Sequence, residues 1–182
     1  MRRERGLLLV VDFQERLLPA IPDGEGALAR GAFLVAVARR LGVPILVTEQ
    51  YPQGIGHTVA AIGEALPDAA RVFEKRAFGA LGEPAIAAVL EDLRREGRDQ
   101  VILCGTEAHV CVLQTALGLR ERGFTVFVAS DAVASRAARD LNPATARLLH
   151  AGCHWVSAEM VAFEWMGRSD IPEFKDVLAL IK

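Results

Sequence analysis

Continuous apolar stretches constrain the fold of this chain most strongly. The clearest cover residues 7–11, 44–47, 101–104 and 125–129, and weaker versions occur at 71–74 and 154–157. A strand with one face in water shows alternating polar and apolar residues, whereas a continuous apolar run is typical of a strand covered on both faces. Such strands belong to parallel sheets. The sequence therefore predicts six strands in one parallel sheet.

Helical segments separate these strands. Residues with helical patterning lie at 26–41, 84–96, 110–122, 143–151 and 172–181. Several of these segments end in a cationic turn followed by glycine, which is a common way to terminate a helix. The alternation predicts an α/β fold, a three-layer sandwich with right-handed crossovers, whose ligand site lies beyond the carboxyl ends of the strands. We expect a single domain over residues 1–182.

Composition limits the classes of partner. The 182 residues are 52% hydrophobic and 24% charged, values that exclude intrinsic disorder. With 21 basic and 23 acidic residues, the net charge of −2 provides no basic excess for nucleic acid or an anionic membrane. Three cysteines in so apolar a chain indicate a reducing compartment. No apolar run approaches the roughly 18 residues of a membrane span or forms an export signal, so we expect a soluble, cytoplasmic protein.

Three residues that can carry chemistry follow three of the predicted strands. Asp12 follows the first strand, Lys75 the third, and Cys111 stands a few residues past the fourth, at the start of a helix. A helix start favours thiolate, an aspartate can take the thiol proton, and a lysine can stabilise the charged forms. Each residue also has a non-catalytic explanation. Asp12 can close a strand in a turn, Lys75 can be a solvated surface lysine, and Cys111 can be packed in the core.

His57 and His109 are the alternative bases. His109 stands two residues from Cys111, a spacing that does not bring side chains together on a helix, so a Cys–His mechanism is the less favoured alternative. The chain has no glycine-rich phosphate loop and no HExxH, CxxC or DxH cluster, so we expect no nucleotide, metal or other cofactor. Residues 49–70 show no clear helical or strand pattern, and they form either a loop that contributes to the site or an ordinary surface loop.

Five segments at predicted strand ends carry a family resemblance. They are VVDFQ at 10–14, TEQYP at 48–52, FEK at 73–75, CGTEAHVCV at 104–112 and VASDAVASR at 128–136. Over nearly its whole length the chain resembles the isochorismatase-like cysteine hydrolases. The resemblance implies a six-stranded parallel sheet and a triad in which Cys111 is the nucleophile, Asp12 the base and Lys75 the electrostatic partner.

The resemblance also implies hydrolysis of a small amide or related acyl compound through a thioester. It places a cis peptide bond between Thr106 and Glu107, and we expect the N–H groups of Glu107 and Cys111 to form the oxyanion hole. The residues expected to line the substrate pocket are Phe13, Gln50, Tyr51, His57 and His109.

Departures from individual family members narrow the expected function. Nicotinamidases carry a metal-binding Asp-x-His after the second strand, where this chain has Gln50, Tyr51 and Pro52. The chain is closer to the metal-independent, isochorismatase domain-containing subgroup. Members that hydrolyse the vinyl ether of isochorismate work without the cysteine, so Cys111 favours acyl hydrolysis. Vinyl ether hydrolysis and a binding module without activity are the alternatives, and the resemblance implies a homo-oligomer.

Overall fold

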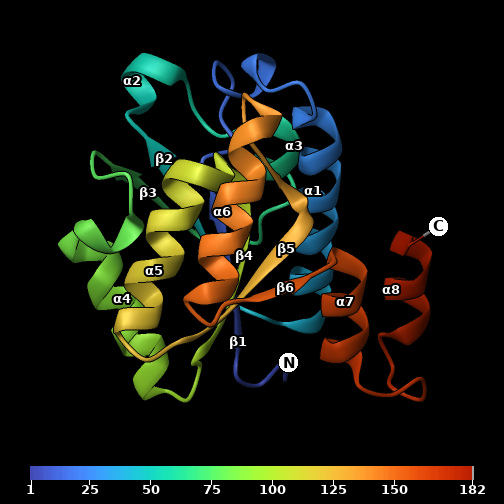
Figure 1. Cartoon of the computed structure of the whole chain (residues 1–182). Coiled ribbons are helices and arrows are strands. Elements are labelled where there is room, and N and C mark those ends of the chain that lie inside the picture. The colour runs from blue at the N-terminus through green and yellow to red at the C-terminus, as the bar shows by residue number, and fades with distance from the viewer. Residues whose placement is uncertain (182) are drawn as a thin grey trace.

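A computed structural model describes residues 1–181 of the chain. One six-stranded sheet runs through the molecule in the order β3-β2-β1-β4-β5-β6, with every neighbouring pair parallel (Figure 1). The strands are β1 (Gly6–Val11), β2 (Ile45–Gln50), β3 (Arg71–Lys75), β4 (Gln100–Thr106), β5 (Thr125–Ala134) and β6 (His154–Val156). The parallel six-stranded sheet predicted from the apolar runs is confirmed.

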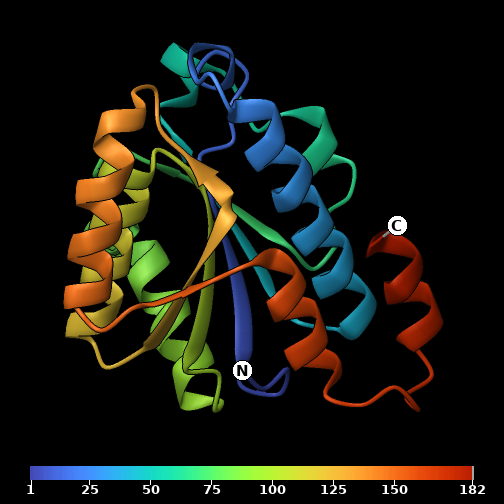
Figure 2. The same ribbon diagram turned by 45° about the vertical axis from the view of Figure 1, so that its right-hand side comes forward.

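Helices cover both faces of the sheet and make the three layers seen in Figure 2. One face carries α1 (Gly24–Leu41), α7 (Ala158–Met166) and α8 (Phe174–Ile181), and the other carries α4 (Pro84–Arg95), α5 (Leu113–Glu121) and α6 (Ala138–His150). Along β1, Leu8 and Val10 pack into the core under α1, whereas Leu7 and Leu9 pack into the opposite core. This two-sided burial explains why the strand has no polar face.

Several elements differ from their predicted extents. The helix α7 was not predicted, because the apolar Met160 and Phe163 on its exposed side obscure the stripe formed by its buried residues. The helix α6 begins at Ala138, so Pro143 lies inside it rather than at its start. Residues 49–70 contain two single-turn helices, α2 (Pro52–Ile55) and α3 (Ala60–Gly63).

The start of α5 also differs. A π-helical turn, η3 (Ala108–Val112), precedes this helix and contains Cys111. Two short 3₁₀ turns, η1 (Leu18–Ala20) and η2 (Ala80–Gly82), complete the elements.

The strand order creates a switch point beside β1. The chain adds β2 and β3 on one side of β1 and then returns to place β4 on its other side. Val11, the last residue of β1, is paired with Thr48 on β2 and with Gly105 on β4. Ligands of open α/β sheets bind at such points, outside the carboxyl ends of the strands. Within residues 1–181, none of the helices has the length and apolar character needed to cross a membrane.

Candidate active site

Asp12 is fixed by both strands that flank β1. Its backbone has a φ of 52°, in the left-handed region that aspartate tolerates better than most residues, and its side chain is fully buried. The Asp12 N–H donates to the carbonyl of Thr48 at 3.1 Å, and the Thr48 hydroxyl donates to Oδ1 of Asp12 at 2.7 Å. From the other side, the hydroxyl of Thr106 donates to the Asp12 carbonyl at 2.7 Å. The carboxylate therefore has one fixed direction.

Lys75 reaches Asp12 from two strands away. The residue ends β3, where it is paired with Gln50 on β2. Its Nζ lies 2.7 Å from Oδ2 of Asp12, and neither side chain has exposed surface. This contact is a fully desolvated ion pair, in which each charge depends on the other because water reaches neither.

Cys111 joins this pair from the π-helical turn η3. The residue is 6% exposed, and its thiol lies near enough to Asp12 and Lys75 for both charges to act on its pKa. Burial is the largest cause that raises the pKa of the thiol, the charge of Asp12 adds to it and Lys75 opposes both, which leaves the pKa at about 12. Burial likewise raises the pKa of Asp12, while the charge of Lys75 and the hydrogen bond from Thr48 lower it. Burial therefore outweighs the effects that favour thiolate, and the resting thiol is protonated.

The segment before Cys111 is tightly constrained. The peptide bond between Thr106 and Glu107 is cis. Gly105 has a φ of 132°, and a Cβ at this position would lie 1.9 Å from the carbonyl oxygen of Val11, so only glycine fits. The buried carboxylate of Glu107 accepts hydrogen bonds from the backbone N–H and from Nε of Arg136, each at 2.9 Å.

The two candidate histidines have partners other than Cys111. His109 Nδ1 lies 2.9 Å from the Ser135 hydroxyl, and its Nε2 lies 3.9 Å from Asp140. His57 Nδ1 lies 3.0 Å from Glu49, and this carboxylate raises the pKa of the imidazole. The structure thus brings Asp12, rather than a histidine, to the thiol.

The remaining expected pocket residues lie in different environments. Phe13 is fully buried in the apolar cluster under α1 and is a core residue. Tyr51 is 42% exposed, with the guanidinium of Arg76 3.9 Å from its ring centroid. Gln50 contacts the site directly, because its Oε1 accepts a hydrogen bond from Lys75 Nζ at 2.7 Å.

Three polar residues support the site: Thr48 and Gln14 were not singled out from the sequence, and Thr106 was singled out only as part of the expected cis peptide bond. Thr48 and Thr106 hold Asp12 as described above, and Gln14 holds the backbone of Gln50. All three are fully buried. The sequence indicates their positions but not their partners, because each lies at or just beyond the carboxyl end of an apolar run, where a buried polar residue must find a hydrogen-bond partner.

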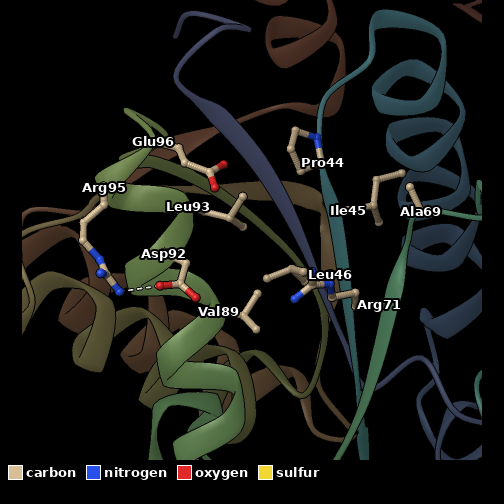
Figure 3. Close-up of a pocket in the computed structure, with 10 residues that line it drawn as sticks. All are labelled: Pro44, Ile45, Leu46, Ala69, Arg71, Val89, Asp92, Leu93, Arg95 and Glu96. Atoms are coloured by element: carbon tan, nitrogen blue, oxygen red, sulfur yellow. Dashed lines mark hydrogen bonds and ion pairs between the residues drawn. The ribbon is translucent and has the colours of Figure 1, made fainter.

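One cavity lies away from this chemistry. Figure 3 shows it between α4 and the first residues of β2 and β3, with a volume of about 480 Å³. Its lining residues are Pro44, Ile45, Leu46, Ala69, Arg71, Val89, Asp92, Leu93, Arg95 and Glu96. The strand residues among them lie at the amino ends of β2 and β3, opposite Asp12, Lys75 and Cys111, so the cavity takes no part in this site. In the described part of the chain, no three His, Cys, Asp or Glu side chains are grouped to hold a metal ion.

A parallel sheet with a buried Asp–Lys pair and a neighbouring thiol at its switch point defines a class of α/β proteins with a cysteine-centred site. The Isochorismatase domain family matches residues 6–160, and the chain belongs to this family. Isochorismatase domain-containing protein 1 of Salmo salar is 37% identical over 171 residues, which is 94% of this chain. The chain spans 59% of the length of that relative.

Solved structures share the whole architecture. The structure of MAR1 ribonuclease from Caenorhabditis elegans is 37% identical, with a TM-score of 0.93, and the match covers 100% of this chain and 91% of that one. YcaC from Pseudomonas aeruginosa, in complex with hexane-2,5-diol and covalent acrylamide, is 25% identical with a TM-score of 0.87. That match covers 99% of this chain and 90% of the other.

Proposed function

We propose that the protein hydrolyses a small amide or related acyl compound, with Cys111 as nucleophile, Asp12 as base and Lys75 as electrostatic partner. One observation carries the proposal: the Cys111 thiol lies beside a buried carboxylate that is itself paired with a buried ammonium. A thiol whose pKa is raised to about 12 needs a base at the moment of attack, and Asp12 is in position to serve.

The first half of the reaction forms a thioester. Asp12 takes the thiol proton while Sγ attacks the substrate carbonyl carbon, and the C=O bond opens to an oxyanion. We assign the stabilisation of this oxyanion to the N–H groups of Glu107 and Cys111. When the intermediate collapses, the C–N bond breaks and the leaving amine takes the proton from Asp12.

The second half releases the acid. Asp12 takes a proton from water while the water oxygen attacks the thioester carbonyl carbon. The C–S bond then breaks, and the proton returns to Sγ. Throughout both halves, Lys75 stays charged and offsets the negative charge that moves between Asp12, sulfur and oxygen.

The Pseudomonas aeruginosa relative carries a covalent acrylamide, a small uncharged amide. This supports a reactive nucleophile on the shared fold. The solved structure named as a ribonuclease suggests RNA as an alternative substrate. A net charge of −2 and a thiol that is 6% exposed favour a small molecule over a polyanion.

Intact-protein mass spectrometry tests the proposal. We expect incubation with a library of small amides and ureides to give an acyl adduct on Cys111 and, for the best compound, release of ammonia or amine. Cys111→Ala should form no adduct, and Cys104→Ala serves as the matched control because Cys104 is fully buried in β4. Turnover of isochorismate by Cys111→Ala would instead support vinyl ether hydrolysis. RNA cleavage without amide turnover, or binding without any adduct, would also contradict the proposal.

We further propose that the reaction needs no metal. The position after β2 is taken by Gln50, whose side-chain oxygen is already bonded to Lys75. We expect dialysis against a strong chelator to leave amide turnover within about twofold of its starting value, and adding Zn²⁺ or Mn²⁺ to give no gain. Loss of turnover that a metal restores would overturn this prediction.

The three cysteines are free, which supports the proposal of a reducing, cytoplasmic setting.

A further inference from the structure

The ammonium of Lys75 has no hydrogen-bond donor left for a substrate. Its three nearest acceptors are Oε1 of Gln50 and Oδ2 of Asp12, each at 2.7 Å, and the Phe78 carbonyl at 3.0 Å, while the Ala77 carbonyl is more distant at 3.4 Å. The sulfur of Cys111 is a further neighbour. A lysine ammonium can donate three hydrogen bonds, so its capacity is used within the protein.

Gln50 is the side chain that completes this set, and it is rigidly held. Its Nε2 donates to the Arg76 carbonyl at 2.9 Å, which fixes the orientation of the amide. The fully buried Gln14 accepts from the Gln50 N–H at 2.7 Å and donates to the Gln50 carbonyl at 3.0 Å. The oxygen of Gln50 is therefore directed at Lys75 and cannot turn away without breaking several bonds.

The other charges around the site are also paired. Asp12 offsets Lys75, Arg136 is bonded to Glu107 at 2.9 Å, and His57 is bonded to Glu49 at 3.0 Å. A substrate carboxylate brought to Cys111 would come close to the Asp12 carboxylate and would find no free donor on Lys75. Burial of an unpaired carboxylate costs several kcal/mol.

We propose that Gln50 is a specificity-determining residue: by occupying the third donor of Lys75, it restricts the site to uncharged small amides and excludes substrates with a carboxylate near the scissile bond. This inference rests on the proposed function, since it names the substrate class of that site. It also assigns Lys75 a purely electrostatic role, without direct contact to the substrate.

Two alkylating probes test the inference without knowledge of the substrate. Iodoacetamide and iodoacetate have nearly the same size and lose the same iodide when sulfur bonds to their methylene carbon, but only iodoacetate is an anion. The measured quantity is the ratio of their labelling rates at Cys111, divided by the same ratio for glutathione. We expect the native protein to favour iodoacetamide at least tenfold. Gln50→Ala leaves one N–H of Lys75 with only the distant Ala77 carbonyl at 3.4 Å, so a substrate anion can compete for it, and the variant should reduce this preference at least threefold.

Two further variants provide controls. Gln53→Ala removes a glutamine that bonds Glu74 and Arg76 instead of Lys75, and it should keep the preference of the native protein. Gln50→Glu keeps an acceptor for Lys75 and adds a negative charge, so it should favour iodoacetamide at least as strongly. Thermal unfolding verifies that each variant is folded.

A native ratio close to that of glutathione would overturn the inference even if Gln50→Ala failed to fold. An unchanged ratio in a folded Gln50→Ala variant would remove Gln50 as the determinant. Neither result bears on amide turnover, which is measured separately by acyl adduct and product. A site that prefers iodoacetamide but turns over no amide would refute the proposed function, while the inference that the site excludes anions would stand.

Discussion

Asp12 affects the Cys111 thiol in two opposing ways, one in the resting protein and one during the attack on the substrate. In the resting protein its negative charge raises the pKa of the thiol, whereas during attack the same carboxylate has to accept the thiol proton. Substitution can separate these effects, because direct alkylation by iodoacetamide requires only thiolate, while acyl transfer also requires a group that returns the proton to the leaving amine.

We expect Asp12→Asn to speed the labelling of Cys111 by iodoacetamide at pH 8 and to abolish amide turnover. Removing the carboxylate leaves the positive charge of Lys75, which lowers the pKa of the thiol. Each unit of lowered pKa increases the thiolate fraction by roughly tenfold. Labelling rates measured from pH 7 to 10, with peptide mapping, give the apparent pKa directly. Cys153 is the internal standard, because burial rather than Asp12 raises its pKa. Slower labelling of Cys111 would mean that Asp12 assists even simple alkylation.

At the scale of elements, the end of β4 must lie against the end of β1 for the site to form. Gly105 allows this contact, since a Cβ there would lie 1.9 Å from the Val11 carbonyl oxygen. We expect Gly105→Ala to lower the free energy of unfolding by more than about 4 kcal/mol, or to prevent folding. The control is Gly118→Ala in α5, where a Cβ meets its nearest neighbour at 3.5 Å and helix propensity gains roughly 0.5–1 kcal/mol. Urea unfolding measures both, and equal stability of the two variants would contradict the expected clash.

The same elements show why part of the site could be predicted from the sequence. Two-sided burial leaves continuous apolar runs, so the strands and the residues that follow them, Asp12 and Lys75, could be placed at one edge. The roles of Gln14 and Thr48 could not, because they depend on the register between β1 and β2, which apolar runs do not specify. The helix α7 was missed for a different reason: the exposed Met160 and Phe163 obscure the apolar periodicity of its buried face.

At the scale of the whole molecule, we expect a homo-oligomer. The family resemblance implies one, and several large apolar side chains are exposed, including Val72 at 50% on the edge strand β3 and Phe78 at 54%. Apolar surface of this kind is a common feature of interfaces. Multi-angle light scattering at micromolar concentration should give a mass that is a multiple of the 19.7 kDa chain. A mass of a single chain at all concentrations would contradict this expectation.

The stability of the whole molecule should depend on alkaline pH through its buried thiols. Burial raises the pKa of Cys104, Cys111 and Cys153 above the ordinary value of 9.0. Above pH 9 the unfolded chain loses thiol protons that the folded chain retains, so this part of the stability is fully present below pH 9 and is lost as the pH rises toward the folded-state values.

Cys104 gives the clearest test, because it is fully buried in β4 and takes no part in the proposed reaction. Each proton held only by the folded state contributes a slope of about 1.4 kcal/mol per pH unit. We expect Cys104→Ala to lower the free energy of unfolding at pH 7, since the smaller side chain leaves a cavity. The variant should also reduce the decline of this free energy between pH 9 and 10 by about 1 kcal/mol, because the unfolded thiol is only half ionised at its ordinary pKa of 9.0. Urea unfolding at closely spaced pH values measures the slope. Leu103→Ala, also fully buried in β4, is the matched control and should lower stability without changing the slope. Equal slopes for Cys104→Ala and the native chain would show that this thiol ionises alike in both states, which would contradict the role assigned to burial.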